Sequence, residues 1–158
     1  MPHSRFEWAD RIKAAEREYQ AVRVALDWLL GATPDEMHDV TDARGWDDLA
    51  VADIYAADRN LDATYLIRMY SVFERAVSSY WRLLPGNAGR EVEGSVLIDE
   101  VGAECKILTD VTRDAQAVRV HRNNLVHRRI DDHAATMAFA DARGNLLNFL
   151  GELPEAWG

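Results

Sequence analysis

Two long stretches of the chain carry apolar residues at every third or fourth position, which is the pattern of amphipathic α-helices. The first covers residues 6–30 and is ended by Gly31 and Pro34; the second covers about residues 61–84 and is ended by Pro85 and Gly86. Helices of this length must bury their apolar faces against one another. The side chains that we expect to be buried are Ile12, Ala15, Tyr19, Val22, Leu26, Leu29 and Leu30 in the first helix, and Tyr65, Leu66, Met69, Tyr70, Phe73, Val77, Trp81 and Leu84 in the second.

Three shorter helices are expected in the rest of the chain. One covers residues 96–108 with Ser95 as its cap, and one covers about residues 111–126 after Thr109 or Asp110. A last helix would begin at Asp131 or Asp132 and end near residue 150. No stretch shows the alternation of a strand, so the sequence predicts an all-α, up-and-down bundle of four to five main helices. The length of 158 residues suits a single domain over residues 1–158.

The segment between the two long helices, residues 32–60, is rich in aspartate and glutamate. We expect an acidic excursion on the surface, with a short helix near residues 49–57. A solvated surface is the simplest interpretation. The segment could also repel unrelated anions or bind a basic partner.

Composition narrows the class of protein. The formal net charge of −9 disfavours broad electrostatic binding to nucleic acid but leaves room for a local basic site. The single cysteine, Cys105, excludes an intrachain disulfide, favours the cytosol and is expected to be a small buried apolar residue. No apolar run approaches the roughly 20 residues of a membrane span, and the N-terminal residues are polar. We therefore expect a cytoplasmic protein without a membrane partner.

Basic side chains are concentrated in residues 119–133, inside this otherwise acidic chain. Such a concentration is where an anionic ligand would find its counter-charge. The arginines and histidines of the segment are Arg119, Arg122, Arg128, Arg129, His121, His127 and His133. His121 and His133 are most simply solvated. Arg119, Arg128 and Arg129 form either a solvated cluster or a set of RNA contacts.

Arg122 has a position that differs from the others. It lies four residues after Val118 and three before Leu125, so it falls on the core-facing side of its helix. A guanidinium in such a place is costly unless it is paired. Glu74, between Tyr70 and the next apolar position of the second helix, faces the same difficulty. We therefore expect Glu74 and Arg122 to pair with each other.

His127 belongs to a different side of the same helix. Arg119, Asn123 and His127 follow at intervals of four and share one face, whereas Arg122 and His127 are about 140° apart on an ideal helix. Asn123 could orient the His127 ring or contact a phosphate. One chain thus supplies half of a site, and a homodimer is expected to complete it.

Two runs of residues resemble conserved features of the HEPN superfamily, in particular the RiboL-PSP and related bacterial families. One resembles the Arg-x4-6-His motif, including the polar residue after the arginine; the other is similar to a helix that carries an aromatic-Glu pair. The resemblance covers roughly residues 61–150. The two runs are Arg122-Asn123-Asn124-Leu125-Val126-His127 and the segment 65–74, Tyr-Leu-Ile-Arg-Met-Tyr-Ser-Val-Phe-Glu.

This resemblance implies a helical bundle, commonly a dimer in which two motifs meet at the interface. It implies a metal-independent endoribonuclease of a toxin–antitoxin or antiviral system, with RNA as substrate, an antitoxin protein as partner and no cofactor. Arg122 and His127 would be catalytic, and Asn123 and Glu74 supporting. One subgroup has a tyrosine two residues after the histidine; here that residue is Arg129, which puts tyrosine-linked regulation in doubt.

An arginine and a histidine can catalyse the RNA cleavage that this resemblance implies. RNA carries its own nucleophile, the 2′-hydroxyl. A histidine can transfer protons near neutral pH, and an arginine can stabilise charge on phosphate oxygens. The acidic residues of 35–58 show no metal-ligand spacing with histidine, so we expect no metal. The alternative is a non-catalytic HEPN-like module that dimerises or binds RNA or a protein partner.

Overall fold

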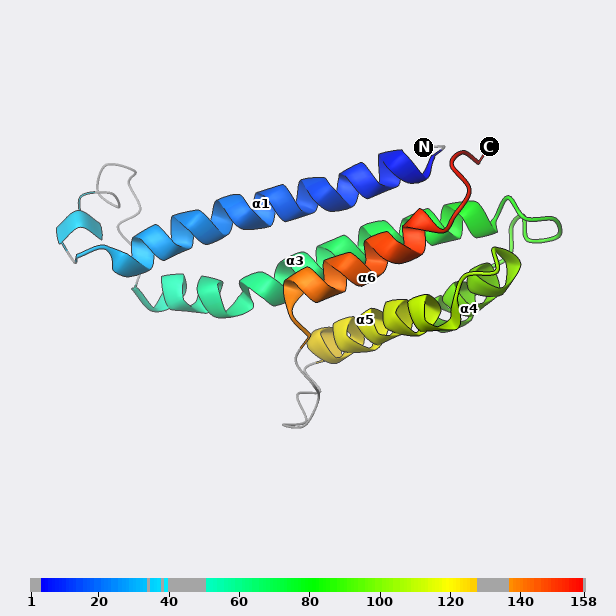
Figure 1. Cartoon of the computed structure of the whole chain (residues 1–158). Helices are drawn as coiled ribbons and strands as arrows, with labels where there is room; N and C mark the ends of the chain where they lie inside the picture. The colour runs from blue at the N-terminus through cyan, green and yellow to red at the C-terminus, as the bar shows by residue number, and fades with distance from the viewer. Residues whose placement is uncertain (1–3, 34, 38, 40–50, 128–136, 158) are drawn as a thin grey trace.

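The computed structural model describes residues 4–33, 35–37, 39, 51–127 and 137–157. Within these residues the chain forms helices and no strand, so the prediction of an all-α bundle is confirmed. The long helices alternate in direction, and α3 contacts each of the others (Figure 1). Their bounds are α1 Arg5–Gly31, α3 Val51–Trp81, α4 Gly94–Glu104, α5 Thr109–His127 and α6 Phe139–Gly151.

The main core lies around the C-terminal two thirds of α3. Most apolar positions predicted to face inward do so. Leu66, Met69, Tyr70, Phe73 and Val77 of α3 are at most 2% exposed, as the helical spacing predicts. The prediction was wrong for Val22 of α1, which is 36% exposed; the small core beside this part of α1 includes Leu26 but not Val22.

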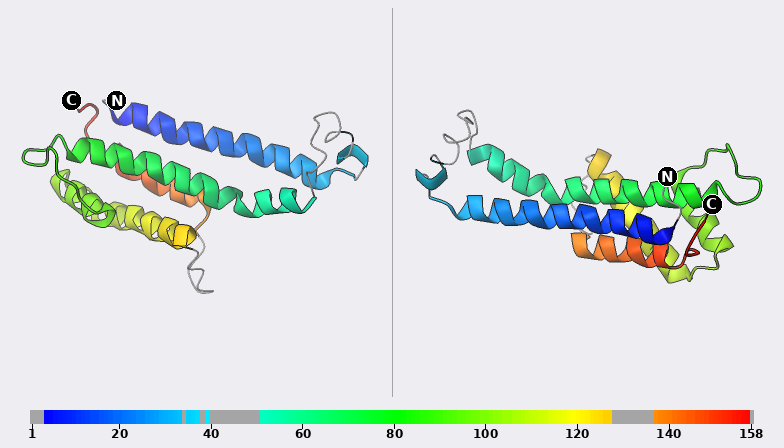
Figure 2. Two further views of the ribbon diagram at one scale, coloured as in Figure 1. Left: turned by 180° about the vertical axis from the view of Figure 1, so that it is seen from behind. Right: turned by 90° about the horizontal axis from the view of Figure 1, so that it is seen from above.

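The helix α3 begins ten residues earlier than the pattern of apolar residues predicted. Residues 51–60, expected to be part of an acidic excursion with a short helix, form its first turns. Here α3 packs on α1: Leu26, Ile54 and Leu61 form a separate small core, against which Met37 also packs and which no described residue of α4, α5 or α6 joins. We call residues 22–31 and 51–62 the arm, since they project beyond the other helices (Figure 2).

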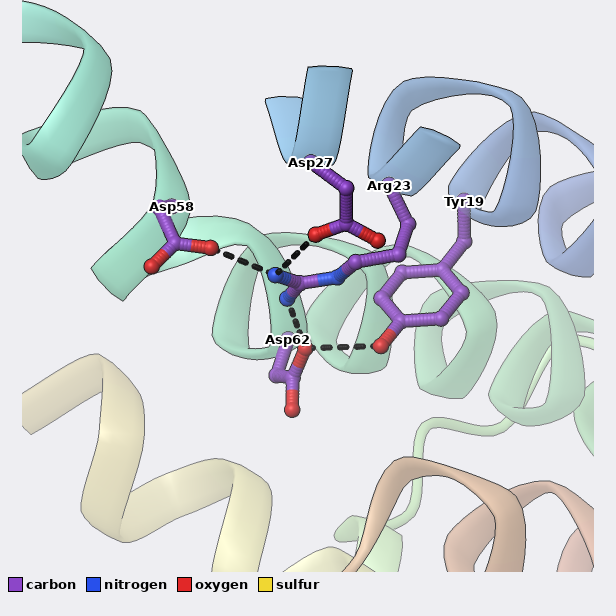
Figure 3. A network of polar contacts seen from close by, with 5 residues as sticks. All are labelled: Tyr19, Arg23, Asp27, Asp58 and Asp62. Carbon is purple, nitrogen blue, oxygen red and sulfur yellow. Dashed lines mark hydrogen bonds and ion pairs between the residues drawn. The ribbon is translucent and has the colours of Figure 1, made fainter. Parts of the chain in front are cut away.

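Polar contacts hold the two helices of the arm together (Figure 3). Arg23 of α1 forms ion pairs with Asp58 and Asp62 of α3, and lies 4.0 Å from Asp27 on its own helix. The hydroxyl of Tyr19 donates to Asp62 at 2.9 Å. The contacts between α1 and α3 join residues 35 and more positions apart in sequence, which explains why the helical pattern alone placed the start of α3 too late.

The ends of α4 and the start of α6 also differ from their predictions. The helix α4 stops at Glu104 rather than near residue 108, because Lys106 takes a φ of 54° and Ile107 donates to the Gly102 carbonyl at 2.8 Å, which closes the helix. Its N-cap is Glu93, without a side-chain hydrogen bond, in place of Ser95. The helix α6 starts at Phe139, after the predicted Asp131 or Asp132; residues 128–136 lie outside the described part.

The two ends of the described chain meet beside the N-terminal turns of α1 (Figure 1). Arg5 donates through its backbone to the Glu155 carbonyl at 3.1 Å and through Nη1 to the Leu153 carbonyl at 2.8 Å. Trp157 is 6% exposed and packs edge-on against Tyr80. Tyr80 also accepts a hydrogen bond from Cys105, which is half-buried rather than fully buried as predicted. Among the described residues, no helix is both long and apolar enough to cross a membrane.

Candidate functional site

The helix α5 presents Arg122 to the core as its spacing predicts. Ala115 and Val118 are fully buried against α3, α4 and α6, and Leu125 is packed against the same core. Arg122 lies between Val118 and Leu125 on this face and is half-buried. Its guanidinium therefore sits at the edge of the bundle, between α3 and α5.

Arg122 is held by an aromatic ring and an amide. Its Cζ lies 5.6 Å from the centre of the Tyr70 ring, a cation–π contact with a residue that is 1% exposed. Its Nη1 donates to Asn123 Oδ1 at 3.0 Å. Its Nε is buried without a hydrogen-bond partner. Asn123 thus orients Arg122. Among the described residues, no hydrogen bond joins Asn123 to His127, so Asn123 does not orient the His127 ring.

The predicted pair of Glu74 and Arg122 is wrong: no ion pair or hydrogen bond joins them in the part of the chain that the structure describes. The register between α3 and α5 explains the difference. It places Tyr70 opposite Arg122, and Glu74, one turn further along α3, near Arg119. The ring of Tyr70 takes the position beside Arg122 that we expected a carboxylate to fill.

Glu74, Tyr70 and Arg119 meet around the first residue of α4. A Cβ added to Gly94 would lie 3.0 Å from Glu74 Oε1, 3.7 Å from the Tyr70 hydroxyl and 3.8 Å from Arg119 Cδ. Burial and the nearby Glu74 carboxylate raise the pKa of Tyr70 far above its ordinary value, while Arg119 and Arg122 act in the opposite direction. The tyrosine therefore keeps its proton at any physiological pH.

Arg119 is fixed in place through a glutamine that the sequence interpretation did not single out. Arg119 Nε donates to Gln116 Oε1 at 2.7 Å. Gln116 Nε2 in turn donates to the Ser95 carbonyl at 2.7 Å and to Asp99 at 2.9 Å, both on α4. This chain of hydrogen bonds sets α5 against α4, so Arg119 is more ordered than a solvated cluster would require. The spacing of Gln116, one turn before Arg119, was the available signal.

His127 differs from Arg122 in its exposure. It is the last residue of α5 and is exposed, whereas Arg122 is half-buried and faces Tyr70 of α3. The two residues are five positions apart on α5, which is about 140° around the helix. Val120 points the same way as His127, seven residues earlier, and is 48% exposed. His121 is half-buried rather than solvated, and this burial lowers its pKa.

The remaining predicted residues cannot be placed. Arg128, Arg129 and His133 lie outside the described residues. Within the described part, no group of three or more histidine, cysteine or acidic side chains could hold a metal ion. What the structure brings together is therefore a polar cluster of Tyr70, Glu74, Arg119, Arg122 and Asn123 between α3, α4 and α5.

Comparison with known proteins gives no relative: no family model matches the chain, and neither do the curated proteins or the solved structures.

Proposed function

We propose that the chain is a metal-independent endoribonuclease of HEPN type, a cytoplasmic toxin or defence effector that acts as a homodimer. One observation carries this proposal. Arg122 is half-buried and oriented by Tyr70 and Asn123, yet none of the described carboxylates forms an ion pair with it. A structural arginine in this position would be expected to take a carboxylate partner, as Arg23 does in the arm.

Arg122 has the properties of a group that stabilises a phosphate. A pre-oriented guanidinium stabilises charge that develops on phosphate oxygens, without reorganising during the reaction. The Tyr70 ring lies against the guanidinium, and Asn123 accepts one of its N–H groups. The remaining donors of Nη1 and Nη2 are then available to phosphate oxygens. Arg119, fixed by Gln116, adds a second positive charge one turn away.

His127 supplies the proton transfer in this proposal. The 2′-hydroxyl oxygen of RNA attacks the adjacent phosphorus while its proton passes to the imidazole. The bond from phosphorus to the 5′ oxygen breaks, and that oxygen receives a proton. The products are a 2′,3′-cyclic phosphate and a 5′-hydroxyl, and no external oxidant, water or metal is consumed. A histidine is suited to both transfers because it changes charge near neutral pH.

A second copy of the chain completes the site. Arg122 points to the core side of α5, while His127 points outward together with the exposed Val120. Contact between the outer faces of two α5 helices would bury Val120 and bring His127 of each copy towards the partner's motif. A protein antitoxin belongs to the same proposal, since a toxin in its host must be neutralised.

Purified protein tests the proposal directly. Wild type, Arg122→Ala and His127→Ala are incubated with messenger and ribosomal RNA, with and without EDTA. His121→Gln is a matched control, because His121 is also a histidine of α5 and has no role in the proposed reaction. We expect wild type and His121→Gln to cleave RNA in EDTA and to leave cyclic phosphate ends. Loss of an acid–base group should slow cleavage by roughly 100-fold or more for His127→Ala.

Growth after induction gives an independent readout. Wild type should arrest cells, and His127→Ala should not. If a purified wild-type dimer leaves RNA intact, and both versions affect growth alike, the nuclease proposal fails. The protein would then be the non-catalytic module, in which the α3–α5 cluster binds RNA or a protein without cleaving it.

A further inference from the structure

A second feature of the bundle is independent of the Arg122–His127 motif. A cleft of about 930 Å³ opens between the N-terminal turns of α1, the C-terminal turns of α3 and the connection that leads to α4. The segments that line it come together at the end of the bundle where the first turns of α1 lie beside the C-terminal segment (Figure 1). Its volume is at the upper end of the range for ligand sites in proteins.

The floor of the cleft is largely apolar, although the buried Nε1 atoms of Trp8 and Trp157 have no hydrogen-bond partner. Trp8, Trp81, Leu97 and Trp157 line it, and each is between 1% and 6% exposed. These residues come from α1, α3, α4 and the C-terminal segment, so the floor belongs to the rigid core of the bundle. Leu83, also in the lining, is 52% exposed and extends the apolar surface to the rim. The cleft can therefore accept apolar side chains.

The rim of the cleft is basic. Arg11, Arg75, Arg82 and Arg90 line it, and all four are exposed. Arg11 lies 5.2 Å from the centre of the Trp8 ring, and Arg90 lies 5.7 Å from that of Trp81, so two of the guanidinium groups are positioned by the floor.

None of these four arginines forms an ion pair within the described chain, although acidic residues outnumber basic ones by 27 to 18. Elsewhere the protein does pair its arginines, for example Arg68 with Glu18 and Arg143 with Glu16. Two carboxylates, Glu74 and Glu91, also line the cleft, which leaves an excess of positive charge. Unpaired cations around an apolar floor are complementary to an anionic ligand that also carries apolar groups.

The shape of the rim indicates an elongated ligand. Arg75, Ser78 and Ser79 lie on one face of α3, and Arg82 directly follows its last residue and donates through its backbone to the Ser78 carbonyl, so the two arginines are about 10 Å apart along the helix direction. A nucleic acid would present one charge at every nucleotide and would need a broad basic surface. That does not fit an apolar floor in a chain of net charge −9. A short peptide with a few carboxylates between apolar side chains fits both the floor and the rim.

We infer that the cleft between α1 and α3 binds an acidic peptide segment of a partner protein, with carboxylates on Arg11, Arg75, Arg82 and Arg90 and apolar side chains on the tryptophan-lined floor. The inference goes beyond the proposed nuclease activity and does not depend on it. Of the residues in the α3–α5 cluster, only Glu74 also lines the cleft.

Selection from a library of short random peptides on the immobilised full chain tests this inference. We expect enriched peptides with at least two carboxylates flanking leucine, isoleucine or an aromatic residue. An enriched peptide is then labelled, and its affinity is measured for wild type and for the double variant Arg75→Glu/Arg82→Glu. Both positions are exposed, so the variant should fold, which circular dichroism and thermal unfolding verify.

The matched control is Arg17→Glu/Arg59→Glu, which changes the net charge equally at exposed positions outside the cleft. The cleft variant should bind the peptide at least about tenfold more weakly, since reversal of two charges opposes the carboxylates at close range. The control variant should bind like wild type.

Three results would overturn the inference. These are no enrichment, enrichment of peptides without carboxylates, and equal weakening by the two double variants. A short single-stranded RNA that binds wild type and loses affinity in the cleft variant, while the peptide does not, would assign the cleft to nucleic acid instead. RNA cleavage by the cleft variant is measured in parallel. Because it depends on Arg122 and His127, it reports on the proposed function separately.

Discussion

The arm and the α3–α5 cluster place an arginine against α3 in opposite ways. In the arm, Arg23 is surrounded by Asp27, Asp58 and Asp62 (Figure 3). In the cluster, Arg122 has the ring of Tyr70 and the amide of Asn123, and no described carboxylate pairs with it. The charge of Arg23 is paired within the fold, whereas the charge of Arg122 has no carboxylate partner among the described residues. Substitutions at the two arginines should therefore affect different properties.

The largest expected effect is on activity at Arg122. Arg122→Ala should lower the rate of RNA cleavage by roughly 100- to 1,000-fold, because loss of one pre-oriented donor to a transition state has effects of that size. Arg113→Ala, at an exposed position of the same helix, should retain the wild-type rate. The rates are measured with one defined RNA under single-turnover conditions. If Arg122→Ala cleaves RNA as fast as Arg113→Ala does, Arg122 has no part in cleavage, and the contrast with Arg23 is lost.

The next largest effect is on stability at Arg23. Arg23→Glu places a fourth carboxylate among three aspartates, and should lower the free energy of unfolding by about 2–3 kcal/mol. Arg17→Glu, exposed on the same helix, should change it by no more than about 0.5 kcal/mol. Urea unfolding measures both. If the two variants unfold alike, the Arg23 contacts do not stabilise the arm.

Arg122→Ala should have a smaller effect on stability, about 1 kcal/mol, because it removes a cation–π contact and one hydrogen bond to Asn123 but leaves no carboxylate unpaired. His127→Ala should unfold like wild type, since His127 is exposed at the end of α5. If Arg122→Ala lowers the free energy of unfolding as much as Arg23→Glu does, the substitution has left a buried partner of Arg122 unpaired.

The packing that positions the cluster can be tested at two glycines. A Cβ at Gly102 of α4 would lie 2.9 Å from Thr112 Oγ1 of α5, whereas a Cβ at Gly144 of α6 would meet nothing within 4 Å. Gly102→Ala should therefore destabilise the protein by about 1–2 kcal/mol, and Gly144→Ala should stabilise it by up to about 1 kcal/mol. Equal shifts in the urea midpoint would mean that α4 and α5 are not closely packed at Gly102.

The smallest expected effect is the pH dependence that comes from His121. Burial lowers its pKa in the folded protein, so protonation favours the unfolded chain. The stability that depends on neutral His121 is fully present above the ordinary histidine pKa of about 6.5 and is lost as the pH falls below that pKa. As the pH falls from about 8 to about 5.5, wild type should lose more free energy of unfolding than His121→Gln does. A constant difference over that range would exclude His121 as the cause.

Much of the fold follows from local pattern. The first helix was predicted within one residue at each end, since its helical periodicity and the stop at Gly31 are local signals. The inward position of Arg122 and the separation of Arg122 from His127 also follow from helix geometry alone. The start of α3 was missed because residues 51–60 are held by contacts with α1, notably of Ile54 and Asp58, which no local pattern contains.

By itself, the sequence determined that the chain is a helical bundle and that α5 carries an inward arginine and an outward histidine, because both depend on the 3.6-residue turn of the helix. Only the tertiary structure decided what Arg122 touches. The register between α3 and α5 set Tyr70 opposite the guanidinium and moved Glu74 one turn away, beside Arg119. That register is set by how the buried side chains of two helices interdigitate, and this depends on both helices at once. It is also what leaves the Arg122 charge unpaired.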